Sequence, residues 1–397
     1  MSCSKEKENL QNFKQTESSR IPKEWERVKL GEVLSLKNGE RPIANDNDIF
    51  PIYGANGIMG YSPNFLVDND FTIVIGRVGA SGEVHLGRGR IWISDNAIYS
   101  ENYNRNKVYM TFLYHLLKFK KISQFASKST HPIITQSFLN SFFIPLPPLP
   151  EQQKIAEILS MVDSAIEKVN QAIAKTERLK KGLMQELLTK GIGHKEFKDT
   201  EIGRIPKEWE VVKISNIADV KGGKRLPKGH NLADFRTPYP YIRVVDFKNM
   251  SIDLANVKFL LPETYKAIER YTISSNDVYI SIAGSVGLAG LIPVELDGAN
   301  LTENAAKLCN LRRVVKDFLA YVLNSLLVQK QIHGFVGKAQ QPKLALFRIE
   351  KIKIPLPPLP EQQKIAEILS TVDKRLELLR NKKEKMERIK KGLMNDQ

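Results

Sequence analysis

Two stretches of the chain repeat apolar residues at the spacing of an amphipathic helix. In the first, residues 151–187, no glycine or proline occurs before Gly182, and the prolines just before it predict an abrupt helix start. Apolar residues alternate at steps of four and three, which is typical of a coiled-coil seam. The predicted seam consists of Ile155, Leu159, Val162, Ile166, Val169, Ile173 and Leu183.

The second stretch, residues 361–397, has the same pattern and predicts a second long helix. About 37 helical residues span roughly 55 Å. Each helix could be a core helix beside its own domain, but two amphipathic helices in one chain favour pairing with each other. Polar residues interrupt the seams at Thr176, Lys180, Lys383 and Lys390. The second seam consists of Ile365, Leu369, Val372, Leu376, Leu379, Met386 and Leu393.

The chain is also duplicated. Residues 13–29 match residues 197–213 at thirteen of 17 positions, with an offset of 184. The block IPLPPLPEQQKIAEILS at 144–160 recurs unchanged at 354–370, with an offset of 210. The second copy is therefore 26 residues longer in its middle. The prolines of this block could be a polyproline ligand for another domain, but their place before each helix favours a role in setting the direction of the helix.

Each copy reads as one variable globular domain followed by one nearly fixed helical tail. A few anchors link the middles: KNGER at 37–41 pairs with KGGKR at 221–225, Asp95-Asn96-Ala97 pairs with Glu303-Asn304-Ala305, and Gly76, Gly79 and Gly82 pair with Gly284, Gly287 and Gly290. Because the linker between the copies is short, the second helix is expected to run back antiparallel to the first, giving a rod with a domain at each end and approximate twofold symmetry. The expected bounds are 1–20 for an N-terminal segment that copies the linker, 21–150 for domain 1, 151–187 for helix 1, 188–204 for the linker, 205–360 for domain 2 and 361–397 for helix 2.

The net charge of +16 points to a polyanionic partner, either nucleic acid or an anionic membrane surface. Most of it lies on the globular parts: 205–360 carries +8 and 21–150 carries +3, whereas 151–187 is neutral. The uncharged stretch Val278 to Val294 contains three glycines and a proline, so it predicts buried strands rather than a membrane span.

Loop arginines and lysines are the candidate DNA contacts, because Arg and Lys neutralise phosphates and Arg can bind guanine with two hydrogen bonds. Any one of them could be ordinary solvated charge. The Tyr53 to Gly57 segment suits a groove contact and equally suits a β-turn. The candidates are Lys37, Arg41, Tyr53, Asn56, Arg77, Arg88 and Arg90 in domain 1, and Lys221, Lys224, Arg225, Lys228 and Arg243 in domain 2.

Catalytic motifs are missing from the sequence. No phosphate-binding loop or dinucleotide fingerprint is present, the six histidines are scattered, and no metal-ligand spacing occurs, so no metal is expected. The two cysteines, Cys3 and Cys309, cannot form a disulfide framework, which favours a reducing, intracellular setting. The polar stretch Met1 to Lys7 lacks the apolar core of a signal peptide.

Taken together, these features resemble the specificity subunit of a Type I restriction–modification system. The resemblance rests on GRIPKEW at 203–209 with its partner IPKEW at 21–25, on the two IPLPPLPEQQKIAEIL blocks, and on the domain–helix–domain–helix order. It covers about residues 13–394. The first copy has Ser18-Ser19 where the second has Ile202-Gly203, a small departure.

The resemblance implies an α/β fold, with two mixed α/β target-recognition domains separated by an antiparallel coiled coil. It implies that each domain reads one half of a split DNA sequence and that the helices set the gap between the halves. Two modification subunits, which bind S-adenosylmethionine and methylate adenine, would dock on the chain, and restriction subunits that use ATP and Mg²⁺ could join them. The chain itself would bind no cofactor and would not be a catalyst. It would be located in the cytoplasm.

Two other classes of function stay open from the residues alone. The chain could be a coiled-coil adaptor that bridges two proteins without binding DNA. It could also be an enzyme, such as a nuclease, whose site carries no recognisable motif.

Overall fold

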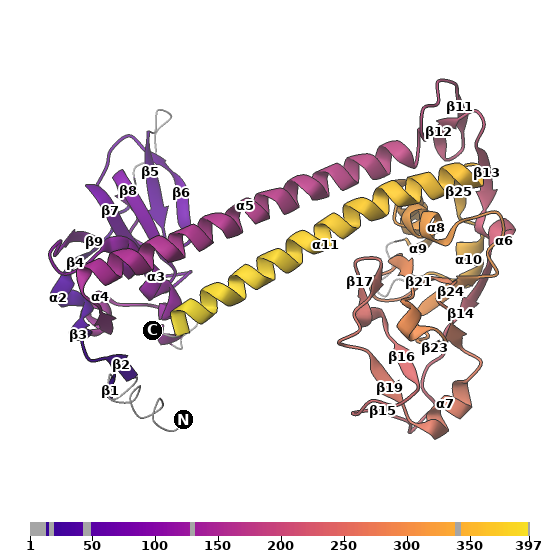
Figure 1. The fold of residues 1–397 in the computed structure, drawn as a ribbon. Coiled ribbons are helices and arrows are strands. Elements are labelled where there is room, and N and C mark those ends of the chain that lie inside the picture. Colours follow the sequence, from indigo (N-terminus) through magenta and orange to yellow (C-terminus); the bar gives the residue numbers. More distant parts are fainter. Residues whose placement is uncertain (1–12, 16–19, 43–48, 128–131, 338–342, 396–397) are drawn as a thin grey trace, which may run out of the picture. The chain divides into compact units, whose positions relative to one another are not determined.

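The computed structural model describes all residues except 1–12, 16–19, 43–48, 128–131, 338–342 and 396–397. It divides into two compact units, which are treated separately below (Figure 1). Unit 1 comprises Met1–Asn170 with Lys382–Gln397, and unit 2 comprises Gln171–Asn381. Most of the expected N-terminal segment therefore lies outside the described residues.

Unit 1 is built on a six-stranded sheet with strand order β4-β9-β7-β8-β5-β6. Helix α3 packs against β7 and β8, and its buried residues share one core with Trp25 and with the start of α5. The elements are β1 (Phe13–Gln15), β2 (Arg20–Pro22), β3 (Glu26–Lys29), α2 (Leu30–Val33), β4 (Leu34–Asn38), β5 (Phe50–Gly54), β6 (Gly57–Ser62), β7 (Val67–Gly76), β8 (Val84–Ile93), β9 (Ala97–Tyr103), α3 (Met110–Phe119), η1 (Ile122–Phe125), α4 (Gln136–Ser141), β10 (Phe143–Leu146) and the first part of α5 (Leu149–Leu187).

Unit 2 repeats the core of unit 1 as a four-stranded sheet with order β14-β24-β21-β22, covered by α8. Its elements up to residue 273 are β11 (Phe197–Thr200), β12 (Gly203–Pro206), β13 (Glu210–Lys213), α6 (Ile214–Ile217), β14 (Asp219–Gly222), β15 (Leu232–Ala233), β16 (Pro240–Ile242), η2 (Val244–Asp246), β17 (Phe247–Lys248), β18 (Ser251–Ile252), β19 (Lys258–Leu260), α7 (Pro262–Ile268) and β20 (Thr272–Ile273). The remainder are β21 (Val278–Ser281), β22 (Ala289–Leu291), η3 (Val294–Leu296), β23 (Ala299–Leu301), β24 (Ala305–Cys309), α8 (Lys316–Leu323), α9 (Leu326–Val336), α10 (Leu346–Glu350), β25 (Lys353–Leu356) and α11 (Leu359–Asn395).

A second sheet distinguishes the longer copy. Strands β15, β19, β16, β23 and β20 form it in that order, with α7 between β19 and β20 along the chain. In unit 1 the corresponding region is a single hairpin, β5–β6, joined to the main sheet through parallel pairing of β5 with β8. The extra residues of the second copy thus build additional surface beside an unchanged core.

The paired helices run antiparallel within each unit. In unit 1, Leu393 of α11 packs in the core that contains Leu159 of α5, and the Lys390 ammonium pairs with the Asp163 carboxylate. Residue numbers therefore rise along one helix as they fall along the other. In this unit a seam lysine that looked like an interruption forms an ion pair between the helices.

The same arrangement recurs in unit 2. Leu183 of α5 packs against the core that contains Leu369 of α11, and Lys180 pairs with Asp373, the counterpart of Asp163. All fourteen predicted seam residues are buried or partly buried. The predicted antiparallel pairing and the mixed α/β domains are confirmed, and each helix starts two residues before its expected first residue because the prolines at its start fit into the first turn.

The stretch expected to be a plain linker contains a hairpin. Strands β11 and β12 pair antiparallel, with Phe197 opposite Pro206. Strands β1 and β2 pair in the same register 184 residues earlier, with Phe13 opposite Pro22. The FKx and RIP ends of the duplicated FKxTExxRIP sequence therefore pair in both copies.

The structure corrects the predicted pairing of glycines between the copies. Gly82 donates its amide to the Gly76 carbonyl over 2.8 Å, and Gly287 makes the same bond to Ser281 over 2.9 Å. Gly82 therefore corresponds to Gly287, not to Gly290. Most of the extra residues of the second copy therefore fall before this turn, a position that residue matching alone could not fix.

The predicted strands in the uncharged stretch Val278 to Val294 are present as β21 and β22, which pair antiparallel. Among the described residues, no helix is long and apolar enough to cross a membrane.

Candidate nucleic-acid interface

The end of β4 and the residues that follow it, 37–41 and here called loop L1, carry two predicted contacts and are fixed to the sheet. Gly39 donates its amide to the Ala97 carbonyl over 2.9 Å, and the next residue donates to the Ile93 carbonyl, also over 2.9 Å. A Cβ at position 39 would stand 2.2 Å from the carbonyl oxygen of Ser94, so only glycine fits. The backbone contacts hold L1 in one conformation.

The second copy repeats this segment at the end of β14, residues 221–225, here called loop L2. Gly223 donates to the Ala305 carbonyl over 3.0 Å, and the next residue donates to Leu301 over 2.8 Å. A Cβ at position 223 would stand 2.1 Å from the Thr302 carbonyl oxygen. Each bond has its counterpart in L1, so the structure places the two K-x-G-x-R loops equivalently on two otherwise different domains.

Arg41 and Arg225 are the last residues of these loops, and both are exposed. The Arg225 side chain is 80% exposed, and its Nε donates to Glu303 Oε1 over 2.9 Å. In the described part of the chain, Arg41 makes no ion pair. Both guanidinium groups keep donors that face solvent.

One lysine in each loop, Lys37 of L1 and Lys224 of L2, contacts a neighbouring side chain. Lys37 pairs with Glu101, and the hydrogen bond with this carboxylate raises the pKa of Lys37 above its ordinary value. Lys224 lies over the ring of Tyr271, 5.3 Å from its centroid. Both ammonium groups stay at the surface, where their positive charge is available to a phosphate.

The Tyr53 to Gly57 segment is a hairpin turn next to L1. Gly54 pairs with Gly57, which leaves Asn56 exposed in a two-residue loop. The Tyr53 carbonyl accepts from the Ser94 amide over 2.9 Å, and burial raises the pKa of the Tyr53 hydroxyl. The turn interpretation is therefore confirmed, and the turn presents Asn56 close to the residues that anchor L1.

Arg243 occupies the equivalent place in unit 2 but is used inside the domain. The Ile242 carbonyl accepts from the Thr302 amide over 3.0 Å, just as the Tyr53 carbonyl accepts from the Ser94 amide in unit 1. The Arg243 guanidinium bonds to Asp246 Oδ1 over 2.6 Å and to the Asn256 carbonyl over 2.8 Å. Since the Asp246 carboxylate is fully buried, these bonds primarily hold the short helix η2 in place.

The two arginines of β8 lie against aromatic rings. Arg88 is 4.9 Å from the ring centroid of Phe71, and Arg90 is 5.1 Å from that of Phe65. Arg90 also pairs with Asp68 over 3.1 Å. Both arginines are exposed, and the stacking holds them in defined orientations.

The remaining predicted contacts are less constrained. Lys221 is exposed on β14, and Lys228 is exposed in the loop that follows it. Arg77 is half-buried beyond β7, where its amide bonds to the Asn96 carbonyl over 2.8 Å. The structure thus brings L1 and the Tyr53 turn together in unit 1, and L2 and η2 together in unit 2.

A joint between domain and helix accounts for part of the duplicated sequence, and we did not predict it. The Trp25 indole N–H donates to Glu151 Oε2 over 3.2 Å, and the Trp209 indole donates to Glu361 Oε2 over 2.9 Å. Both tryptophans are buried. The signal was present as the unchanged Trp and Glu of the two repeated blocks.

A buried glutamine completes each joint. Gln152 Oε1 accepts from the Tyr109 amide over 2.8 Å, and its Nε2 donates to two backbone carbonyls. Gln362 Oε1 accepts from the Val315 amide over 2.9 Å, and its Nε2 likewise donates to two carbonyls. Neither side chain is exposed to solvent. Each tail is therefore bonded to its own domain in the same way.

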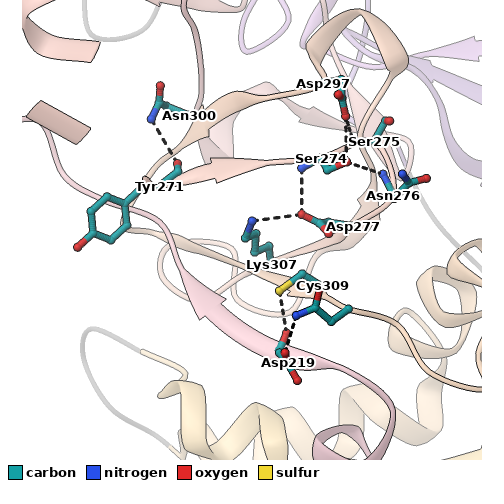
Figure 2. A network of polar contacts seen from close by, with 11 residues as sticks. Asp219, Tyr271, Ser274, Ser275, Asn276, Asp277, Asp297, Asn300, Lys307 and Cys309 are labelled. Atoms are coloured by element: carbon teal, nitrogen blue, oxygen red, sulfur yellow. Dashed lines mark hydrogen bonds and ion pairs between the residues drawn. The ribbon is translucent and has the colours of Figure 1, made fainter. Parts of the chain in front are cut away.

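Carboxylates in unit 2 hold loops together. Figure 2 shows Asp297 accepting from the hydroxyl of Ser274 over 2.9 Å and from the amide of Ser275 over 2.6 Å. Asp277 accepts from the Ser274 amide over 2.9 Å and pairs with Lys307 over 3.3 Å. Backbone hydrogen bonding from Ser275 lowers the pKa of Asp297 below its usual value. No group of side chains suited to hold a metal ion occurs in the described ranges.

Known proteins are similar to this chain in sequence and in fold. The chain matches the family described as Type I restriction modification DNA specificity domain over residues 22–178 and 206–388. It is 30% identical to the Type I restriction enzyme MjaVIII specificity subunit of Methanocaldococcus jannaschii, across 97% of this chain and 94% of that protein.

Two solved structures have the same fold. A crystal structure of the S subunit of a Type I restriction–modification system from M. genitalium matches with a TM-score of 0.66, covering 96% of this chain and 97% of that chain at 18% identity. A structure described in connection with complex assembly of a type I system matches with a TM-score of 0.52, covering 95% of this chain and 98% of that chain, also at 18% identity. The two matched domains, the twofold repetition of sequence and the shared fold lead to one conclusion: the chain belongs to the Type I restriction–modification DNA specificity family and carries two copies of its domain.

Proposed function

We propose that this chain recognises a split DNA sequence, one half with each domain, for a Type I restriction–modification complex. The observation that carries the proposal is the pair of loops L1 and L2. Both are held by matching backbone bonds and end in an exposed arginine, on domains that otherwise differ. Matching loops on differing surfaces suit two half-sites of different sequence.

Loops L1 and L2 supply the central contacts in this proposal, through Arg41 and Arg225. The exposed candidates Lys37, Asn56 and Lys228 add contacts to phosphates or base edges. The other candidate contacts are Tyr53, Arg77, Arg88, Arg90, Lys221 and Lys224. Arg243 supports η2, and its Nε and one terminal nitrogen are engaged within the domain.

Binding should depend on the positive charge of these loops. Phosphate contacts release counterions, so the affinity of the assembled complex should fall steeply with salt. Arg225→Ala should weaken DNA binding in a gel-shift assay with the methyltransferase subunits present. Unchanged affinity and unchanged sequence preference would remove Arg225 from the contact surface, and absence of DNA binding by the parent complex would favour the adaptor function.

The two tails are proposed to dock two copies of one methyltransferase subunit. The joint explains why buried residues such as Gln152 and Gln362 are repeated, but it does not explain repeated residues on the exposed face. Lys154 and its counterpart Lys364 are exposed, as are the repeated residues Gln153 and Glu157 and their counterparts Gln363 and Glu367. A recent duplication would also leave identical exposed residues, so a stoichiometry measurement is needed.

Charge reversal tests this docking surface. Lys154→Glu and Lys364→Glu should each remove one methyltransferase subunit in native mass spectrometry, and the double variant should remove both. Lys168 is an exposed lysine of the same helix that the second copy does not repeat, since Leu378 stands there. Lys168→Glu should therefore retain two subunits. A parent complex with one methyltransferase per chain would contradict the docking proposal.

The chemistry is proposed to reside on the partner subunits. S-adenosylmethionine would serve the methyltransferases, and ATP and Mg²⁺ would serve restriction subunits where these join. The chain would act in the cytoplasm, where its DNA is, without catalysis of its own. Methylation or cleavage by the purified chain alone would contradict this assignment.

A further inference from the structure

Three residues beside L2 form a hydrogen-bonded series from the domain interior to the surface. The Thr302 hydroxyl, on a residue that is 5% exposed, donates to Glu303 Oε2 over 3.0 Å. Glu303 Oε1 then accepts from Arg225 Nε over 2.9 Å. The carboxylate is thus held from behind by a buried hydroxyl, and it holds the arginine in front.

The Arg225 guanidinium bonds to Glu303 through its Nε. A guanidinium has five N–H donors in a planar fork, and the bond to Glu303 uses the one on Nε. No described residue bonds to the two terminal nitrogens, and the side chain is 80% exposed. Two adjacent donors on one edge match the O6 and N7 acceptors of guanine in the major groove.

Glu303 is charged at neutral pH. Burial raises the pKa of this carboxyl, but the hydrogen bonds from Arg225, its own backbone and Thr302 outweigh burial, so the pKa lies below its ordinary value. A surface ion pair of this kind contributes little to stability. Its effect on the direction of the guanidinium is therefore of more consequence than its effect on folding.

We propose that Glu303 is a positioning residue that orients Arg225 to read one guanine in the half-site of the second domain. The proposal rests on the proposed function, since it specifies how one loop arginine contributes to DNA recognition. Glu303 would touch no base itself. It would reduce the number of orientations that Arg225 must lose on binding guanine.

The first domain supplies a natural comparison. The anchoring bonds of L1 and L2 place Ser94-Asp95 where Thr302-Glu303 stand in the second domain. Aspartate is one methylene shorter than glutamate, and within the described residues Arg41 has no ion pair. Arg41 is therefore expected to contact DNA without a fixed orientation, and with less discrimination between bases.

Selection from a random DNA library tests the proposal on the complex reconstituted with methyltransferase subunits. In the parent complex, the half-site of the second domain should contain a guanine whose preference is lost in Arg225→Lys, a variant that keeps the charge but not the fork. Glu303→Ala should reduce the preference for that same guanine by about five- to tenfold. It should leave the other positions and the salt dependence of binding unchanged, because Arg225 keeps its charge.

Matched variants separate positioning from general effects. Glu303→Gln, which keeps one acceptor oxygen, should retain part of the guanine preference. Asp95→Ala removes the corresponding carboxylate in the first domain and should change base preferences less than twofold.

Several outcomes would overturn the proposal. They are an unchanged guanine preference in Glu303→Ala, a uniform loss of affinity for all sequences, or a loss in Asp95→Ala as large as that in Glu303→Ala. If the parent complex selects no split sequence, the proposed function itself fails, and this result is distinct from failure of the Glu303 assignment.

Discussion

Replacing Gln362 by alanine should lower the free energy of unfolding of unit 2 by about 3 kcal/mol. The side chain is fully buried and makes three hydrogen bonds, to the Val315 amide over 2.9 Å and to the carbonyls of Arg313 and Pro357 over 3.0 and 2.8 Å. Each such bond contributes about 1 kcal/mol net, and each group left buried without a partner costs about 1–3 kcal/mol. Three bonds therefore give an expected loss of roughly 3 kcal/mol.

The neighbouring residue provides the control. Gln363 has the same side chain on the same helix but is exposed. Gln363→Ala should change the stability by less than about 0.5 kcal/mol, as surface substitutions usually do. Gln152→Ala should reproduce the large effect in unit 1, because Gln152 makes the corresponding three bonds.

Hydrogen exchange followed by mass spectrometry assigns the effect to one unit. The Val315 amide, which Gln362 holds at the start of α8, should exchange roughly 100-fold faster in Gln362→Ala, whereas peptides of unit 1 should not change. Urea unfolding measures the total decrease in the free energy of unfolding. A loss below about 1 kcal/mol, or one equal to that of Gln363→Ala, would refute the view that the buried glutamine bonds each tail to its domain.

Two further predictions concern pH and helix length. Burial lowers the pKa of His115 to about 4, although Asp163 has the opposite effect. As the pH falls below about 6.5, this histidine therefore becomes protonated in the unfolded chain but stays neutral in the folded chain. The stability of unit 1 should then fall by about 2–3 kcal/mol from pH 6.5 to pH 4, and His115→Gln should flatten this part of the pH profile; equal slopes in urea unfolding would contradict it. Inserting one heptad, roughly 10 Å, into both α5 and α11 should lengthen the preferred gap between half-sites by about three base pairs, measured by library selection, and an unchanged gap would exclude the helices as a ruler.

The helices were predictable from the sequence because their signals are local. The heptad of Ile155, Leu159 and Val162 and the prolines before it are read within a few turns of chain, and α5 and α11 follow. Antiparallel pairing followed from chain connectivity. The ion pair of Lys180 with Asp373 did not, because the sequence shows the lysine only as an interruption of the seam.

The joint and the contact surface needed the three-dimensional structure. Trp25 and Glu151 lie 126 residues apart, and nothing in either segment alone identifies the other as its partner. Arg243 appeared equivalent to other loop arginines until its bonds to the buried Asp246 were seen. Duplication revealed that these segments are repeated, and the hydrogen bonds explain part of that repetition.

The central claim is that one chain with two specificity domains directs recognition of a split sequence. The most direct test is base-resolution mapping of the DNA positions methylated by the complex of this chain with its methyltransferase subunits. The account predicts two short defined sequences separated by a fixed number of unspecified base pairs, with a methylated adenine in each. A continuous recognition sequence, or methylation without sequence preference, would contradict it.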